Sequence, residues 1–328
     1  PLPGSAGIGG SVQSNVGEMV NKGLEAVLDY NNKIGDFRYG ITVNGAFNRN
    51  KLLTLNPELE GVFINDGGTN EAYNTTASRT EPGLPLGQFY GLIAEGIYAD
   101  NEGRVSRPTI SGDHKPQAGD LIYRDLNDDG VINDDDRDYI GNPWPKLTYG
   151  LNLSLGYKGF DLSAFFNGVQ GVDIYNAAQV FSHTFYTDYN TTNKIYETSF
   201  FTPETGLTDK PRAGNVAETD KNGNWNRISS FHVENGSFLR LRNLQLGYTI
   251  PPSILNRLNI SSARIFVMGN NLFTITKYSG MDPELAGLDT RAGSEGNRAG
   301  GVRARGIDAG WNRYPLTRLF SIGLNLEF

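Results

Sequence analysis

Apolar and polar residues alternate with period two in several parts of the chain, the pattern of strands whose two faces meet different surroundings. The segment 317–328, TRLFSIGLNLEF, is one of the clearest examples. One side of this predicted strand carries Phe320, Ile322, Leu324, Leu326 and Phe328. The other side carries Leu319, Ser321, Gly323, Asn325 and Glu327. The segment is therefore predicted to be a strand with one apolar face and one largely polar face.

The same alternation predicts further strands along the chain. They are expected over 24–30, 37–48, 147–157 and 160–166, and near 88–99, 230–250 and 263–273. Within 239–250 the apolar residues change from odd to even positions, and a β-bulge near Arg242 or Asn243 is expected to keep them on one face. No long helical periodicity occurs, so the fold class is predicted to be all-β and antiparallel, with about eight to ten strands.

The predicted connections differ in length. The segment 157–161, YKGFD, predicts a tight hairpin turn with Gly159, and 249–263 predicts a short linker. Much longer polar connections cover 50–86, 100–145, 171–229 and 276–316. Short turns that alternate with long loops are typical of an outer-membrane β-barrel. A soluble β-sandwich also alternates, but the small uncharged residues on the polar sides and the aromatic residues near strand ends favour the barrel.

Composition limits the function classes. The 328 residues include no cysteine, which excludes a disulfide framework, a thiolate zinc site and a cysteine nucleophile. The net charge is -7 and no basic block stands out, so no nucleic-acid partner is expected. The first ten residues, PLPGSAGIGG, do not have the pattern of a signal peptide. No apolar run approaches ~18 residues, although a barrel strand needs only about 9–11 tilted residues.

The acidic stretch 125–138, DLNDDGVINDDDRD, has the spacing of a calcium-binding loop. Gly130 stands at the sharp turn of that pattern, and Ile132 is expected to be a buried apolar anchor. The predicted oxygen ligands are Asp125, Asn127, Asp129, the Val131 carbonyl, Asn133 and Asp136. We expect a structural Ca²⁺ site with a dissociation constant of about 10⁻⁴–10⁻³ M, although a solvated acidic turn is the simpler alternative.

Catalysis has little support in the sequence. The histidines His114, His183 and His232 are isolated, and no nucleophile elbow or metalloprotease motif accompanies them. Acidic residues in the long connections leave a glycosidase-like carboxylate pair open. Three tryptophans fall in predicted loops: Trp144, Trp225 and Trp311. Trp225 and Trp311 are candidate substrate-binding residues that would stack on sugar rings or peptide side chains, although packing within the loops is the simpler expectation.

Several segments in order carry a resemblance to a known family. They are NVGEMVNKGLE (15–25), FYGLIAEGIY (89–98), the run 119–176 that contains the acidic loop, ENGSFLRLRNLQLGYTIP (234–251), GNNLFTITKYSGMDPE (269–284) and the terminal LNLEF. In these segments the chain resembles the C-terminal part of SusC/RagA-type TonB-linked outer-membrane transporters of Bacteroidetes. The acidic loop matches the D-x-N-x-D-G segment of that family.

The resemblance implies a transmembrane, 22-stranded β-barrel with long extracellular loops, of which residues 1–328 would be a C-terminal part with a calcium-loop-like insertion at about 119–142. The plug domain and TonB box of the family are absent from this sequence. The implied function is TonB-dependent import of glycans, oligosaccharides or oligopeptides, and the implied location is the outer membrane. Implied partners are a SusD-like surface lipoprotein, TonB–ExbB–ExbD through the missing N-terminal part, outer-membrane lipid, and the barrel assembly machinery, which would recognise Phe328.

Two other functions stay open from the residues alone. A soluble calcium-dependent glycan-binding β module would also combine alternating strands with the acidic loop. An enzyme would need a loop carboxylate whose replacement abolishes turnover of a polysaccharide. Extraction into detergent separates the transporter from the soluble module, because only the transporter is expected to need a membrane. No enzyme activity is expected.

Overall fold

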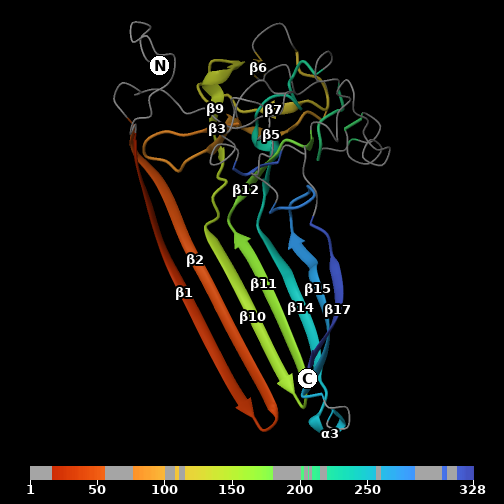
Figure 1. The fold of residues 1–328 in the computed structure, drawn as a ribbon. Helices are drawn as coiled ribbons and strands as arrows, with labels where there is room; N and C mark the ends of the chain where they lie inside the picture. The colour runs from red at the N-terminus through yellow and green to blue at the C-terminus, as the bar shows by residue number, and fades with distance from the viewer. Residues whose placement is uncertain are drawn as a thin grey trace, which may run out of the picture.

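The structure is a computed structural model of the 328-residue chain. It describes residues 17–55, 77–99, 108–110, 115–179, 201–202, 206, 209–214, 220–255, 260–284, 305–308 and 316–328. In these residues one large antiparallel sheet occupies one end of the molecule, and four small sheets gather at the other end (Figure 1). The all-β expectation is confirmed for this part of the chain. None of its helices is long and apolar enough to cross a membrane.

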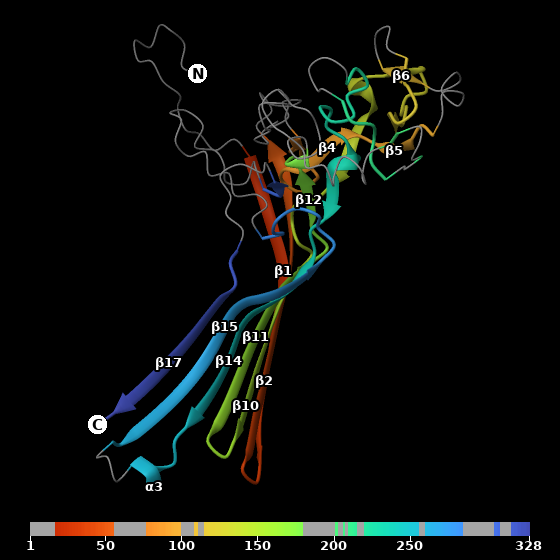
Figure 2. The same cartoon turned by 90° about the vertical axis from the view of Figure 1, so that its right-hand side faces the viewer.

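The large sheet has seven strands, slightly fewer than the eight to ten expected. All neighbouring pairs are antiparallel, and the described residues form no closed barrel, so β1 and β17 are the edges of an open, curved sheet (Figure 2). In spatial order the strands are β1 (Gly17–Ile34), β2 (Phe37–Leu55), β10 (Leu147–Tyr157), β11 (Phe160–Gln170), β14 (Phe238–Thr249), β15 (Ser262–Thr276) and β17 (Leu319–Glu327).

The alternation located these strands well, and β10 has the expected bounds. The expectation of strand structure near 88–99 is confirmed, but this segment forms two short strands, β4 (Gln88–Leu92) and β5 (Ala94–Ile97), in two small sheets rather than in the large one. The cause is burial on both faces. Phe89 and Leu92 lie in apolar cores, and a Cβ on Gly91 would stand 2.5 Å from the Ile228 carbonyl oxygen.

The expected bulge in β14 is present. The register with β11 shifts between Phe165 and Phe166, which pair with Asn243 and Leu241, so Arg242 is the extra residue of β14 in this pair. The shift keeps Leu241 and Leu244 on one face of the sheet, as the period-two pattern requires. The expected hairpin turn between β10 and β11 is also present. Lys158 and Gly159 have φ angles of 44° and 88°, and two consecutive positive values are the mark of a two-residue type I′ turn.

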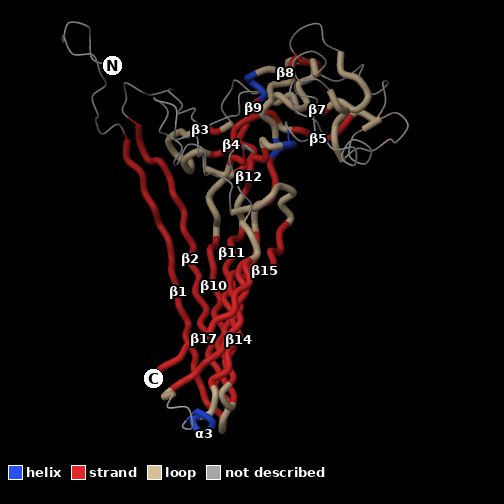
Figure 3. The backbone as a smooth tube through the Cα atoms, turned by 45° about the vertical axis from the view of Figure 1, so that its right-hand side comes forward, coloured by secondary structure: helices blue, strands red, loops and turns tan. Residues whose placement is uncertain are grey.

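The small sheets are built from the long connections between the strands of the large sheet (Figure 3). One contains β13 (Val233–Asn235), β12 (Asp173–Asn176) and β16 (Ile307–Asp308), and another contains β3 (Ser78–Arg79), β4 and β9 (Arg137–Gly141). The two-stranded sheets pair β5 with β7 (Leu121–Tyr123) and β6 (Thr109–Ile110) with β8 (Val131–Ile132). Short helices η3 (Asp134–Asp136), η4 (Ser230–His232) and α3 (Pro252–Leu255) complete the described elements.

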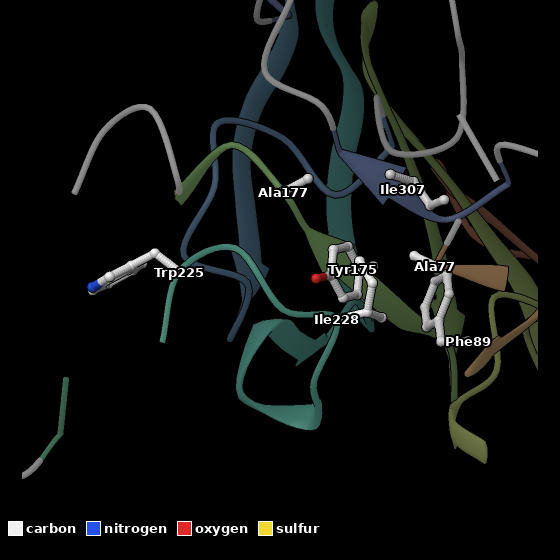
Figure 4. Packing of buried hydrophobic residues seen from close by; sticks show 7 residues of the cluster. All are labelled: Ala77, Phe89, Tyr175, Ala177, Trp225, Ile228 and Ile307. Carbon is white, nitrogen blue, oxygen red and sulfur yellow. The ribbon is translucent and has the colours of Figure 1, made fainter. Parts of the chain in front are cut away.

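These connections fold around apolar cores of their own. One core joins residues far apart in the sequence, and Figure 4 shows its side chains: Ala77, Phe89, Tyr175, Ala177, Trp225, Ile228 and Ile307. A second core holds Leu92, Ile110, Leu121, Tyr123 and Ile132. Burial of apolar surface at roughly 25 cal/mol per Å² is the main force that orders such segments. The connections are therefore a folded loop-end domain over the described residues, rather than isolated polar loops.

Candidate functional site

The pairing register sorts the large sheet into two faces of opposite character. One row of paired residues crosses the sheet on the first face: Asp29, Thr42, Asn152, Phe165, Asn243, Asn270 and Leu319. The next row lies on the second face: Tyr30, Ile41, Leu153, Ala164, Leu244, Gly269 and Phe320. We call the first the polar face and the second the apolar face. The alternation predicted in the sequence is thus consistent across all seven strands.

The apolar face is uncovered. Phe320 and Ile322 are 73% and 74% exposed, and exposed apolar side chains occur on the other six strands as well. Apolar patches of more than a few hundred Å² are rare on soluble monomers and mark contact with protein or lipid. Phe328, the candidate assembly signal, is 84% exposed next to the end of β17. This surface is suited to a hydrocarbon environment.

Aromatic rings gather on the apolar face beside the short turns. The rings of Phe160 and Tyr248 lie 4.5 Å apart across β11 and β14, and Tyr30 and Tyr39 lie 6.0 Å apart across β1 and β2. Phe37 stacks beside Tyr39 at 5.8 Å. Rings with a polar tip are favoured where hydrocarbon meets water, and transmembrane barrels carry aromatic girdles at both interfaces. The turn end of the sheet has the composition of such an interface.

A charged network on the polar face holds residues 278–284, which follow β15, against the large sheet next to the β14 bulge. Arg240 is 2% exposed, and its Nη2 donates to both carboxylate oxygens of Asp282 at 2.7 and 2.8 Å. Arg240 Nε donates to Thr274 at 2.7 Å, and Arg240 and Arg242 both pair with Glu284. The network fixes residues 278–284 against the sheet. Sequence reasoning missed it, because the parity of β14 places Arg240 on the polar face but does not identify carboxylates more than 40 positions away.

A cavity of about 640 Å³ opens on the sheet beside the short turns, and we call it the turn-end cavity. Its lining residues are Asn31, Asn32, Lys33, Arg38, Tyr39, Ser154, Leu155, Gly156 and Asp161. Asp161 makes a two-point ion pair with Arg264, whose Nε lies 3.0 Å from Oδ1. This ion pair passes over Gly247, where a Cβ would come within 2.4 Å of Arg264. A glycine at 247 therefore lets the pair span three strands.

The acidic loop adopts a compact turn held by its own side chains. Asp125 Oδ2 accepts from the Gly130 amide at 2.8 Å, and Asp129 Oδ1 accepts from the Val131 amide at 2.8 Å. Gly130 has φ +83°, the sharp turn that the calcium pattern requires at this position. Ile132 is 1% exposed in the second core, as expected of the apolar anchor. Strands and η3, rather than two helices, surround the loop.

The donor set partly fits a hard cation such as Ca²⁺. Asp125 Oδ1 is buried and has no hydrogen-bond partner, so it is an oxygen that lacks a donor or a cation. Asp136 is 0% exposed, and its oxygens accept from the Leu126 and Asn133 amides, each at 2.8 Å. The described residues hold no cluster of three or more acidic or histidine side chains placed to bind a metal. The Ca²⁺ ligand set stays a prediction.

Buried polar groups join residues 117–124, which precede the acidic loop, to residues 212–214 and 220–225. Asp120 is 0% exposed; its Oδ1 accepts from Arg212 Nε at 2.6 Å and from Asn224 at 2.9 Å. Asp220 accepts from the Asn224 and Trp225 amides, and burial raises the pKa of its carboxyl. Burial also raises the pKa of the Tyr123 phenol, which donates to the Gly223 carbonyl. These contacts make residues 117–124, 212–214 and 220–225 one unit.

The tryptophan predictions meet different outcomes. Trp225 is 0% exposed in the first core, and its Nε1 donates to the Arg212 carbonyl at 3.1 Å (Figure 4). Its ring is enclosed by other core side chains in this conformation, as the simpler expectation of loop packing has it, and the substrate-stacking role stays a prediction. Trp311 lies outside the described residues, as do His114 and His183. His232 is 0% exposed and packs 5.7 Å from the Tyr175 ring.

The chain was compared with known protein families and with known proteins. No family model matches the chain. The chain is 33% identical to TonB-dependent receptor P3 of Formosa agariphila over 331 residues, which cover 100% of this chain and 30% of that protein. It is 31% identical to TonB-dependent receptor P26 of the same organism and 21% identical to TonB-dependent receptor SusC of Bacteroides thetaiotaomicron, again over its whole length. The chain spans about 30% of the length of these relatives.

Solved structures show the same fold. "Structure of the RagAB peptide transporter" matches with a TM-score of 0.69 at 23% identity, covering 100% of this chain and 31% of that one. "Structure of the RagAB peptide importer in the 'open-open' state" matches with the same TM-score at 24% identity and the same coverage. The open seven-stranded sheet and the loop-end domain therefore correspond to one part of a larger architecture.

Proposed function

Because the chain belongs to the TonB-dependent receptor family, among relatives of the SusC and RagA type, we propose that it forms part of an outer-membrane barrel wall and its extracellular loops. The full-length protein would import large nutrients, glycans or oligopeptides, with energy supplied through TonB. This family consists of transporters rather than enzymes. Within the wall, the apolar face would meet lipid, the polar face would line the lumen, and the loop-end domain would lie outside the cell.

The observation that carries the proposal is the uncovered apolar face with one polar face behind it. A soluble glycan-binding module would bury such a face against a second sheet, as β-sandwiches do. A barrel wall leaves it in hydrocarbon, where exposure of Ile322 and Phe320 is favourable. The seven-stranded sheet leaves β1 and β17 as open edges, which are unfavourable in lipid. Further strands of the full-length protein would close them, in line with the 30% coverage of the relatives.

A spin-label experiment on the full-length protein in lipid tests this arrangement. This chain has no cysteine, so single cysteines at neighbouring positions of β17 can carry the label, once any cysteine elsewhere in the protein is replaced. A label at Ile322 is expected to collide with dissolved oxygen, which concentrates in hydrocarbon. A label at Ser321, on the opposite face, is expected to collide with a water-soluble nickel chelate. Water accessibility at both positions would refute the lipid-facing assignment.

Uptake measurements would identify the substrate class. The solved relatives are described as peptide transporters or importers, whereas the notion of a glycan comes from the sequence resemblance alone. Cells that depend on this protein would be given labelled oligopeptides and labelled oligosaccharides in parallel. A SusD-like lipoprotein at the loop end is the partner that we propose, by analogy with the two-component name RagAB. Co-purification of the full-length protein with such a lipoprotein would support it, and purification alone under mild extraction would count against it.

We also propose that Ca²⁺ stabilises the acidic loop. Support comes from the buried, unpaired Asp125 Oδ1 and from the turn at Gly130. Ca²⁺ would supply the positive charge that this oxygen lacks, and it would offset repulsion among neighbouring carboxylates. Asp125, Asn127, Asp129 and the Val131 carbonyl would hold it, with Asn133 and Asp136 as further ligands.

Calorimetric titration with CaCl₂ tests the calcium proposal on the full-length protein. Binding with a dissociation constant of roughly 10⁻⁴–10⁻³ M is expected, and Asp129→Ala should weaken it. Asp138→Ala is the matched control, because Asp138 is an exposed carboxylate outside the predicted ligand set. No heat of binding up to several millimolar Ca²⁺, or equal loss in both variants, would show that the loop is a solvated acidic turn.

A further inference from the structure

Two cations stand directly opposite each other at the turn end of the sheet. Lys33 of β1 and Arg38 of β2 are cross-strand partners next to the turn that joins these strands. The register places both on the polar face, in the same row as Gly156 of β10. Like charges directly opposite in an antiparallel pair destabilise it. This arrangement therefore favours a negative group near the two side chains.

The described part of the chain supplies one shared carboxylate near them, because Asp161 stands in the same row beyond Gly156, where it attracts Arg38. Among the described residues, neither Lys33 nor Arg38 forms an ion pair with a carboxylate. Both line the turn-end cavity, whose one acidic lining residue, Asp161, is already paired with Arg264. On the same face, Asp29 accepts from Thr42 at 2.6 Å and from Asn31 at 2.7 Å. The cavity thus holds a surplus of positive charge beside neutral donors.

We propose that the turn-end cavity receives a carboxylate side chain from the part of the full-length receptor that this chain does not include. The proposal rests on the proposed function, in which the polar face lines a lumen. The chain spans about 30% of the length of its relatives, so most of a full-length receptor lies outside it. An aspartate or glutamate from that part would neutralise Lys33 and Arg38 and would accept hydrogen bonds from Asn31 or Ser154.

The exposure of the cations favours a tethered carboxylate over a free anion. Lys33 and Arg38 are both exposed, and exposed ion pairs are weak and screened by salt. A free anion would therefore occupy the cavity only at high concentration. A carboxylate on the same polypeptide has an effective concentration on the order of millimolar or above, which compensates for a weak intrinsic affinity. The site is thus suited to fixing one part of the receptor against its wall.

Zero-length cross-linking tests the proposal on the wild-type, full-length receptor in outer-membrane vesicles. A water-soluble carbodiimide activates a carboxylate, the Lys33 amine attacks it, and an amide forms while the carbodiimide leaves as its urea with the carboxylate oxygen. Peptide mass spectrometry then identifies the partner of Lys33. We expect an aspartate or glutamate that belongs to the receptor but lies outside residues 1–328.

Two further measurements set the controls. Lys158, in the neighbouring turn, lies outside the cavity lining and should not give the same cross-linked peptide. Arg38→Gln should lower the yield at Lys33 several-fold, because the carboxylate loses its second cation, and it should leave Lys158 unaffected. A Lys33 link to Asp29 or Asp161, to another protein, or to nothing would overturn the proposal. Uptake of substrate is measured separately, so such a result leaves the transport function standing.

Discussion

Replacement of Arg240 by methionine should release residues 278–284 from the large sheet. Arg240 is 2% exposed and Asp282 is 5% exposed, so Arg240→Met leaves a buried carboxylate without its guanidinium partner. Removal of one partner of a buried ion pair costs about 3–5 kcal/mol. Asp282 keeps one backbone donor, the Glu284 amide at 2.8 Å, so we take the lower value, about 3 kcal/mol. At about 1.4 kcal/mol per tenfold change, this corresponds to a roughly 150-fold change in local opening.

Hydrogen–deuterium exchange of the full-length protein in detergent measures this opening. Amide protons in 278–284 should exchange roughly 150-fold faster in Arg240→Met, while β10 and β11 remain as protected as in the wild type. The double variant Arg240→Met/Asp282→Leu should recover most of the protection, because it removes the buried charge as well as its partner. Less than a threefold change in the single variant, or no recovery in the double variant, would refute the reasoning.

Three other outcomes are expected. Ile322→Arg should destabilise the protein in lipid by about 2–4 kcal/mol if position 322 lies near the bilayer midplane. Ser321→Arg, on the polar face, should destabilise it much less. Thermal unfolding of both variants in liposomes measures the difference. Chelation of Ca²⁺ should speed proteolysis within 125–138 and leave the heat-resistant mobility of the sheet in gel electrophoresis unchanged; unfolding of the sheet would contradict a role confined to the loop. Burial raises the pKa of the Asp220 carboxyl above 3.8, so folding favours the protonated form. The contribution of this carboxyl to stability is therefore full below pH 3.8 and falls as the pH rises through the raised pKa. Melting temperatures measured across this range should therefore depend less on pH in Asp220→Asn than in the wild type. Asp209→Asn is the control, and parallel pH profiles of Asp220→Asn and Asp209→Asn would exclude the buried carboxyl as the cause.

The sequence predicted the large sheet better than the loop-end domain, for a physical reason. Successive residues of its strands lie on faces of opposite character, so every second residue reports its face. Tyr157 and Phe160 bound the turn as predicted, and the parity change near Arg242 located the bulge. The register between strands then follows from the same alternation, since a slip by one residue would move Leu153 to the polar face and Asn152 to the apolar face.

The loop-end domain has no such periodic boundary. One of its cores joins Ala77, Tyr175, Trp225 and Ile307, residues from three separate connections, and no local pattern records that they meet. Trp225 illustrates the limit, because a tryptophan in a polar segment fits an exposed platform as well as a core residue, and only its neighbours distinguish the two. The acidic loop was found by spacing alone because its hydrogen bonds are local, from Asp125 to the Gly130 amide and from Asp136 to the Leu126 amide.

In the proposed membrane arrangement, the lengths of the strands also indicate where the apolar band of the large sheet would end on the side of the loop-end domain. β10 and β11 have 11 residues each, about 36 Å at ~3.3 Å per residue, which spans the ~25 Å band at a tilt of about 45°. β1 and β2 have 18 and 19 residues and continue beyond the last pair with β10, Leu147 with Phe47 (Figure 1). Beyond Phe47 the sequence of β2 reads NRNK, so both faces become polar at that point. Arg49 lies two positions after Phe47 and therefore on the same face of β2, where a charged side chain is tolerated only outside hydrocarbon. In the proposed arrangement, the β1–β2 hairpin would therefore leave the apolar band at Phe47. Beyond this point Leu52 forms backbone hydrogen bonds with Leu84 and Gly83 of the loop-end domain.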